Sequence, residues 1–178
     1  MTEKNNLNLK TIPVSKYMTK NVITATADQT IQSICILMHE KNIGSVVIVR
    51  RVVDGLKPIG IITERDIIHQ IGKVDLFTTQ SSVRELMSGS GNRDLITISP
   101  DTSVSDAIST MHANNIRRLP IIDNNDKGMI GIITDKDIIK IILRISGITT
   151  SYYIPSTFNV TFEERQEENK RNNFRNSL

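Results

Sequence analysis

The sequence predicts a mixed α/β (α+β) protein made of two β-α-β-β-α repeats that pack about a pseudo-twofold axis. An internal repeat is the first observation: residues 23–49 align with 96–122 at an offset of 73. Residues 59–68 and 130–139 then agree at eight of ten positions. Both copies contain apolar residues at helical spacing, followed by short apolar runs typical of buried strands. A repeat of about 60 residues is marginal alone, so we expect two repeats to share a core and form two related clefts.

The first repeat is expected to begin with a short strand at residues 22–25. An amphipathic helix follows, because apolar side chains recur on one helix face. Strands at 45–50 and 55–63 come next, and a last helix runs from Thr63 to about Ile71. The apolar face of the first helix is formed by Ile31, Ile34, Cys35 and Met38.

The second repeat predicts the same order, beginning with a strand at residues 95–98. Its first helix is capped by Ser103, with strands at 119–123 and 128–134 and a last helix from Thr134 to about Ile145. The apolar face of its first helix is formed by Val104, Ala107, Ile108 and Met111.

The repeats divide the 178-residue chain into five parts. Five of the seven aromatic residues follow the second repeat, where they could fold back on the protein or dock a partner. The predicted parts are an N-terminal tail at 1–11, repeats at 12–72 and 83–146, a linker at 73–82, and a C-terminal extension at 147–178.

Composition and charge exclude several classes of protein. The net charge of +3 arises within the first twenty residues, so no basic stripe supports nucleic-acid binding. Cys35 is the only cysteine and can form neither an internal disulfide nor a cysteine-based zinc site. There is no apolar run of about 18 residues and no signal-peptide core. We therefore expect a cytoplasmic protein that does not span a membrane.

The repeated sequence Gly-Ile-Ile-Thr-x-x-Asp ends a strand and opens a helix in each copy. The Thr and Asp are Thr63 and Asp66 in the first copy, and Thr134 and Asp137 in the second. One interpretation is structural, because this spacing suits a helix cap. The other is functional, because helix N-termini attract phosphate and a carboxylate can accept both hydroxyl groups of a ribose. Spacing alone favours the cap.

The repeated unit resembles the CBS domain, named after cystathionine β-synthase, whose intramolecular pair is called a Bateman module. The resemblance covers about residues 12–146 and is typical of free-standing two-domain proteins of archaea and bacteria. It is carried by the doubled Gly-Ile-Ile-Thr-x-x-Asp, by Met18-Thr19 and Met87, and by the segments 42–45 and 115–123.

The resemblance implies an adenosine-containing ligand, with Asp66 and Asp137 on the ribose and Thr63 and Thr134 on the phosphate side. The base would lie against apolar side chains and main chain, although the same positions also fit an ordinary strand core. These positions are Ile23, Thr24 and Ala25 in the first repeat, and Ile96, Thr97, Ile98, Pro120, Ile121 and Ile122 in the second.

Basic residues distinguish the two repeats. Arg117 and Arg118 lie where family members that bind nucleotides often place phosphate ligands, whereas the aligned Gly44-Ser45 carries no charge. Arg65 and Lys136, inside the motifs, are further candidates. Which cleft the two arginines serve stays open, as does the alternative that they are exposed strand-edge residues.

These features favour a non-catalytic sensor that binds AMP, ADP or ATP and signals to a partner by a conformational change. S-adenosylmethionine is a rival ligand, and a dimerisation module with degenerate clefts is a structural alternative. Nothing in the sequence forms a catalytic triad, a P-loop or a metal cluster, and His39 and His112 fit exposed helix positions better than metal ligands. We therefore expect no enzyme activity and no cofactor.

The resemblance also implies a disc-like homodimer formed through the helices. The last helix agrees with this expectation, because it carries more isoleucines than one buried face can accommodate. They are Ile138, Ile139, Ile141, Ile142 and Ile145.

Overall fold

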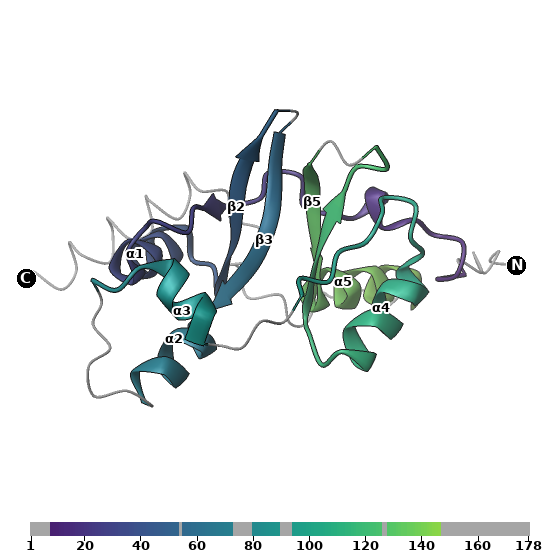
Figure 1. Cartoon of the computed structure of the whole chain (residues 1–178). Coiled ribbons are helices and arrows are strands. Elements are labelled where there is room, and N and C mark those ends of the chain that lie inside the picture. The colour runs from purple at the N-terminus through teal and green to yellow at the C-terminus, as the bar shows by residue number, and fades with distance from the viewer. Residues whose placement is uncertain (1–7, 54, 73–79, 90–93, 126–127, 147–178) are drawn as a thin grey trace, which may run out of the picture. The chain divides into compact units, whose positions relative to one another are not determined.

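The computed structural model describes residues 8–53, 55–72, 80–89, 94–125 and 128–146. The chain forms two compact units, residues 1–139 and 140–178, and the contacts given below all lie in the first. The C-terminal extension and most of the linker lie outside the described residues. Figure 1 shows the elements in chain order.

The first repeat has the predicted order of elements. They are β1 (Thr24–Ala25), α1 (Ile31–Lys41), β2 (Ser45–Val52), β3 (Gly55–Thr63) and α2 (Glu64–Ile71). Strand β2 is central, with β1 parallel and β3 antiparallel to it. The structure extends β2 two residues beyond the predicted end, so the turn to β3 is shorter than expected.

The second repeat forms a two-stranded sheet of β4 (Arg118–Ile122) and β5 (Met129–Thr134), between α4 (Val104–Ala113) and α5 (Asp135–Ser146). The strand predicted at 95–98 is wrong, although all the other predicted elements are present.

A single parallel bridge, Ile98 to Ile121, replaces that strand. The amide of Ile98 donates to the carbonyl of Pro120 at 3.0 Å. In the first repeat the equivalent of Pro120 is Val47, whose amide donates to Ile23 at 3.4 Å. Proline has no N–H to make that second bond, so the ladder stops at one residue pair.

The leading segment of the first repeat bonds to the second repeat. It contains a short 3-10 helix, η1 (Val14–Lys16). The amide of Val14 donates to Thr102 at 2.9 Å, and Thr19 exchanges two backbone hydrogen bonds with Ile132 in β5, at 2.9 and 3.0 Å.

The leading segment of the second repeat bonds, in turn, to the first. Its helix α3 (Val83–Gly89) was not predicted from the sequence. The amides of Val83 and Arg84 donate to Gln29 and Ala27, each at 2.9 Å. Each repeat is therefore completed by the leading segment of the other.

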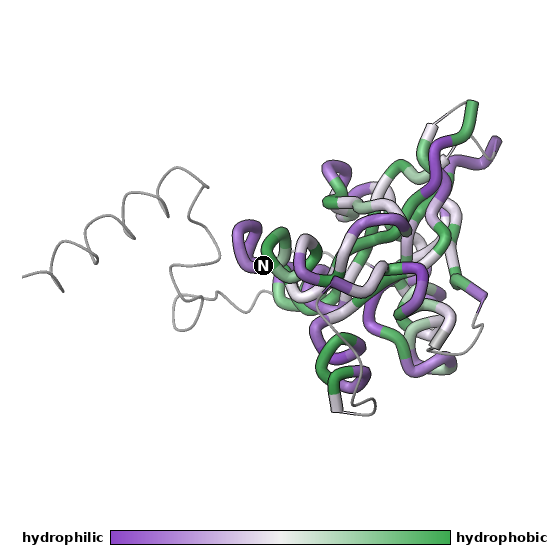
Figure 2. Tube along the Cα trace, turned by 60° about the vertical axis from the view of Figure 1, so that its left-hand side comes forward, coloured by the Kyte–Doolittle hydropathy of each residue, from purple (hydrophilic) through white to green (hydrophobic). Residues whose placement is uncertain are grey.

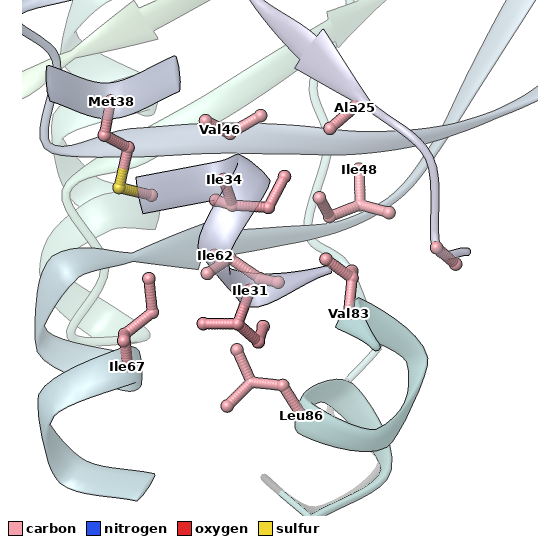
Figure 3. Packing of buried hydrophobic residues seen from close by; sticks show 11 residues of the cluster. Ala25, Ile31, Ile34, Met38, Val46, Ile48, Ile62, Ile67, Val83 and Leu86 are labelled. Carbon is pink, nitrogen blue, oxygen red and sulfur yellow. The ribbon is translucent and has the colours of Figure 1, made fainter. Parts of the chain in front are cut away.

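The core of the first repeat includes two side chains from this exchanged segment. Val83 and Leu86 are 0% and 1% exposed and pack against α1 and the sheet (Figure 3). The predicted face of α1 is correct except for Cys35, which is exposed. The other members of the cluster are Ala25, Ala27, Ile31, Ile34, Met38, Val46, Ile48, Ile62 and Ile67.

The opposite face of the first sheet is also apolar. Val47 and Val49 point away from the first core and cluster with Ile132 of β5, with Val22, Ile61 and Met129 around them. Figure 2 traces the hydropathy along the chain. Strand side chains alternate between two buried faces, which confirms the prediction that the strands are covered on both sides.

Two glycines of the repeated motif lie in close contact with methionines of the leading segments, each of which packs against the other repeat. Gly60 in β3 lies under the tip of Met87, and a Cβ there would overlap that methyl group. Gly131 in β5 lies under Met18, where a Cβ would be 2.6 Å from the sulfur and 3.1 Å from the backbone oxygen of Thr19. Glycine thus permits close contact between each sheet and the segment from the other repeat.

Substituting these glycines tests the close packing of the leading segments against the sheets. We expect Gly131→Ala to lower the free energy of unfolding by about 1–3 kcal/mol, because the new methyl group meets backbone as well as Met18. Gly60→Ala should cost less, because only the flexible end of Met87 must move. Urea denaturation of the two variants measures the difference, and an equal or reversed order would contradict this packing.

Candidate functional site

The first motif forms a complete capping box at the start of α2. The hydroxyl of Thr63 accepts from the amide of Asp66 at 3.2 Å, and the amide of Thr63 donates to Oδ2 of Asp66 at 2.8 Å. The hydroxyl of Thr63 also donates to this Oδ2, at 2.7 Å. Thr63 is in extended conformation, so the chain turns from β3 into the helix at this residue.

The second motif has the same bonds at the start of α5. The amide and hydroxyl of Thr134 donate to Oδ2 of Asp137, at 3.0 and 2.7 Å, and the amide of Asp137 donates back to the hydroxyl at 3.4 Å. Thr134 and Asp137 are half-buried, as are Thr63 and Asp66. The structural interpretation of both motifs is therefore confirmed.

Capping occupies only one oxygen of the first motif's carboxylate. Both donors to Asp66 bind Oδ2, and no described residue bonds to its Oδ1. An ionised carboxylate has four acceptor positions, so a cap at one oxygen leaves the other available for hydroxyl groups. Capping and ligand binding are thus compatible roles for the same side chain.

The side chains predicted to contact the base differ in their exposure to solvent. Six of the nine are half-buried: Ile23 and Thr24 in the first repeat, and Ile96, Thr97, Ile98 and Ile122 in the second. The other three candidates are buried, and Ala25 and Ile121 are 4% and 0% exposed. Pro120 is also buried. Ala25, Pro120 and Ile121 contribute to the cores, and only their main chain is suited to a ligand.

The two arginines lie in different surroundings. Arg117 is exposed, and its carbonyl accepts from the amide of Asp135 at 3.0 Å. Arg118 is half-buried and pairs with Thr134 in the sheet. Its guanidinium, however, reaches the first repeat, where Nη2 is 3.8 Å from the position that a Cβ on Gly44 would take.

The remaining candidates are exposed. Arg65 and Lys136 lie on the first turns of α2 and α5, and His39 and His112 lie at equivalent positions of α1 and α4. Among the described residues, no three His, Cys, Asp or Glu side chains group as a metal site would require.

An open hollow of about 330 Å³ lies on the helices of the second repeat, and Arg118 is not part of its lining. It is largely apolar, with His112 and Asp135 among its polar residues. Its lining is completed by Ile108, Met111, Asn115, Ile116, Ile138 and Ile139.

Sequence reasoning missed Glu64, the first residue of α2. Its amide donates to the carbonyl of Gly44 at 3.3 Å, and its Oε2 lies 3.1 Å from the Cβ position of Gly44. The alignment of the two repeats already places Gly44-Ser45 at the positions of Arg117-Arg118. Nothing in the linear sequence shows that Glu64 and Arg118 both lie beside Gly44, because they belong to different repeats.

Comparison with protein families identifies the repeats. The CBS domain model matches residues 14–73 and 83–144, which together make up more than half of the chain. The chain belongs to the CBS-domain family. It carries a pair of CBS domains, a type of module that is generally regulatory.

The curated relatives include proteins of archaea, bacteria and a plant. An uncharacterized protein of Methanopyrus kandleri is 36% identical over 133 residues, covering 75% of this chain and 64% of the relative. The CBS domain-containing protein YhcV of Bacillus subtilis is 36% identical over 131 residues, covering 70% and 81%. The chain spans less than two thirds of the first relatives it matches, and only 37% of one from Methanocaldococcus jannaschii.

Solved CBS pairs share the fold. The CBS domain pair of protein MJ0100, solved in complex with 5′-methylthioadenosine and S-adenosyl-L-methionine, is 26% identical with a TM-score of 0.60. The match covers 73% of this chain and 98% of that one. None of the described helices of the present chain is long and apolar enough to cross a membrane.

The cap of α2 can be tested without a ligand. We expect Thr63→Ala to lower the free energy of unfolding by about 0.5–2 kcal/mol, because it removes the hydroxyl that bonds to the amide and the carboxylate of Asp66. Thr63→Ser retains that hydroxyl and should recover most of the loss. Denaturant unfolding is the measurement, with the exposed Arg65→Ala as a control expected to stay within about 0.5 kcal/mol. A loss in Thr63→Ser as large as in Thr63→Ala would contradict the assigned bonds.

Proposed function

We propose that this CBS pair is a non-catalytic sensor that binds an adenosine-containing ligand at its Thr-x-x-Asp motifs. The observation that carries the proposal is the geometry of Asp66, whose Oδ2 completes the cap while its Oδ1 has no partner among the described residues. Two vicinal hydroxyl groups of a ribose are donors of the kind that this second oxygen can accept.

Two ligand classes compete for the site. Arg118, half-buried beside the first turn of α2, favours a phosphate-bearing ligand such as AMP, ADP or ATP. The MJ0100 pair, by contrast, was solved with 5′-methylthioadenosine and S-adenosyl-L-methionine. We favour an adenine nucleotide because a guanidinium forms strong charge-assisted hydrogen bonds with phosphate, and we keep S-adenosylmethionine as the second candidate.

A sensor needs a partner that reads the bound state. We propose that the protein works in the cytoplasm as a homodimer and passes the signal to another protein. Exposed isoleucines on the helices support such contacts: Ile68 and Ile71 of α2 are 70% and 53% exposed, and Ile139 and Ile142 of α5 are 55% and 43% exposed.

A thermal-shift screen with AMP, ADP, ATP, GTP, 5′-methylthioadenosine and S-adenosylmethionine tests the proposal. A ligand at a hundred times its Kd adds about 2.7 kcal/mol of stability, which raises Tm by several degrees. We expect a shift with adenosine ligands that Asp66→Asn or Asp137→Asn reduces, because asparagine offers only one acceptor oxygen.

A matched control comes from α4. Asp106 plays a similar capping role there, accepting from the hydroxyl of Ser103 at 2.8 Å, but lies outside the motifs. Asp106→Asn should therefore retain the full ligand shift. No shift with any adenosine ligand at millimolar concentration would overturn the sensor and leave a dimerisation module. A shift retained in both motif variants would overturn the ribose assignment.

A further inference from the structure

The hairpin of β2 and β3 is longer than its counterpart in the second repeat. Strands β2 and β3 contain eight and nine residues, whereas β4 and β5 contain five and six. Figure 1 shows that α1, α2 and α3 lie away from the tip of this hairpin. Val53, in the turn at the tip, is fully exposed. The additional length of the first hairpin therefore lies outside the core.

Two adjacent arginines lie at this end of β2. Arg50 and Arg51 are exposed, and their side chains form no hydrogen bond or ion pair with another residue that the structure describes. Arg50 is directly opposite Lys57 of β3. Like charges at directly opposite positions of two strands repel each other, so a nearby anion stabilises this end of the hairpin.

One edge of β2 is unpaired at the same place. Strand β1 pairs with β2 only at Val47 and Ile48, and none of the described residues pairs with that edge between 49 and 52. The amide of Val47 faces β1, because it donates to the carbonyl of Ile23 at 3.4 Å. Since a strand repeats every two residues, the amide and carbonyl of Arg51 face the same open side. An unpaired edge of this kind can accept an added strand.

The second repeat lacks the two cations. By the alignment of the repeats, Arg50 corresponds to Asp123 and Arg51 corresponds to Asn124. The side-chain amide of Asn124 donates to Oδ2 of Asp101 at 2.7 Å, so this position is already bonded within the chain. A basic edge is therefore a feature of the first hairpin and not of the repeated unit.

We propose that the end of the β2–β3 hairpin binds an extended acidic peptide segment of a partner protein, which adds to the open edge of β2 as a further strand. Arg50 and Arg51 point to opposite faces of the sheet because they are consecutive in a strand. Two consecutive acidic residues of an added strand alternate in the same way, so both arginines gain an anionic partner. A flat lipid surface would meet only one of these faces, and we therefore favour a peptide over a membrane.

This surface is separate from the Thr-x-x-Asp motif. Lys57 precedes Thr63 by six residues of β3, which is roughly 20 Å at the rise of an extended strand. The inference therefore does not rest on the binding of an adenosine ligand, and either proposal can hold while the other fails.

Fluorescence anisotropy of a labelled peptide tests the proposal on the full-length protein. The probe is Thr-Thr-Val-Glu-Glu-Val-Thr-Thr, whose residues favour an extended strand around two consecutive glutamates. The same peptide with lysine in place of both glutamates is the charge-reversed control. At about 0.01 M salt we expect saturable binding of the acidic peptide with a Kd of roughly 10 to 500 μM, and no binding of the control. Binding should weaken at least about fivefold at about 0.15 M salt, because the Debye length falls from about 30 to about 8 Å.

Substitutions separate the contribution of charge from that of the open edge. Arg50→Gln and Arg51→Gln each remove one charge and should weaken binding about three- to tenfold. Arg51→Pro also removes the amide that faces the open edge, and should weaken binding at least about threefold more than Arg51→Gln does. The pairing with β3 does not use this amide. Lys16→Gln, the matched control, removes a charge at an exposed position of η1 and should stay within about twofold of the unsubstituted protein.

A nuclear magnetic resonance titration of the unsubstituted protein gives a readout that needs no variant. The peptide should shift the amide signal of Arg51 and leave that of Asp135, at the second motif, in place. The reverse pattern would overturn the proposal. Circular dichroism and the Tm of each variant check that the fold is retained.

Three further outcomes would overturn the proposal. The first is the absence of saturable binding at about 1 mM acidic peptide. The second is peptide binding that Arg50→Gln and Arg51→Gln leave unchanged; if these variants also self-associate, the arginines serve to protect the edge from aggregation. The third is arginine-dependent binding to vesicles of phosphatidylserine and phosphatidylcholine without peptide binding, which would assign the surface to a membrane.

Discussion

The fold depends on one constraint: a repeat of about 60 residues is marginal as an independent core. A unit of this size buries a smaller fraction of its surface than a larger domain does, and the cores here are aliphatic. In the structure, the leading segment of each repeat packs against the other repeat. Val83 and Leu86 enter the core of the first repeat, and Val14, which is fully buried, bonds to the second repeat through Thr102.

The exchange reaches the candidate site through the motifs. Gly60, three residues before Thr63, is in close contact with Met87 from the leading segment of the second repeat. Gly131 is likewise in contact with Met18 from the leading segment of the first repeat. The capped helix ends are therefore built on strands that are in contact with the other repeat. A ligand that moved the end of β3 would change this packing, which gives the proposed sensor a physical route between its repeats.

The sequence predicted what the repeat and local chemistry determine. Thr63 and Asp66 form a cap because their spacing satisfies the helix end, and the alternating faces of β2 follow from period-two burial. Pro120 stops the strand at Ile98, a local effect that repeat similarity concealed. The packing of each leading segment on the other repeat, and the approach of Arg118 to Gly44, are long-range contacts, and no local pattern encodes which repeat a segment packs against.

Because each repeat packs against the leading segment of the other, the two repeats acquire their packing partners at different times during synthesis. One face of the first sheet can be covered once residue 87 has emerged, because Val83 and Leu86 are the last described contributors to that core cluster. The opposite face, with Val47 and Val49, packs against Ile132 and is covered only later. The second repeat needs Thr19, which is made 113 positions before its partner Ile132. Domains generally fold during synthesis from the N-terminus. Here the leading segment must wait for β5, so one core of the first repeat can be complete while that segment is still unpaired.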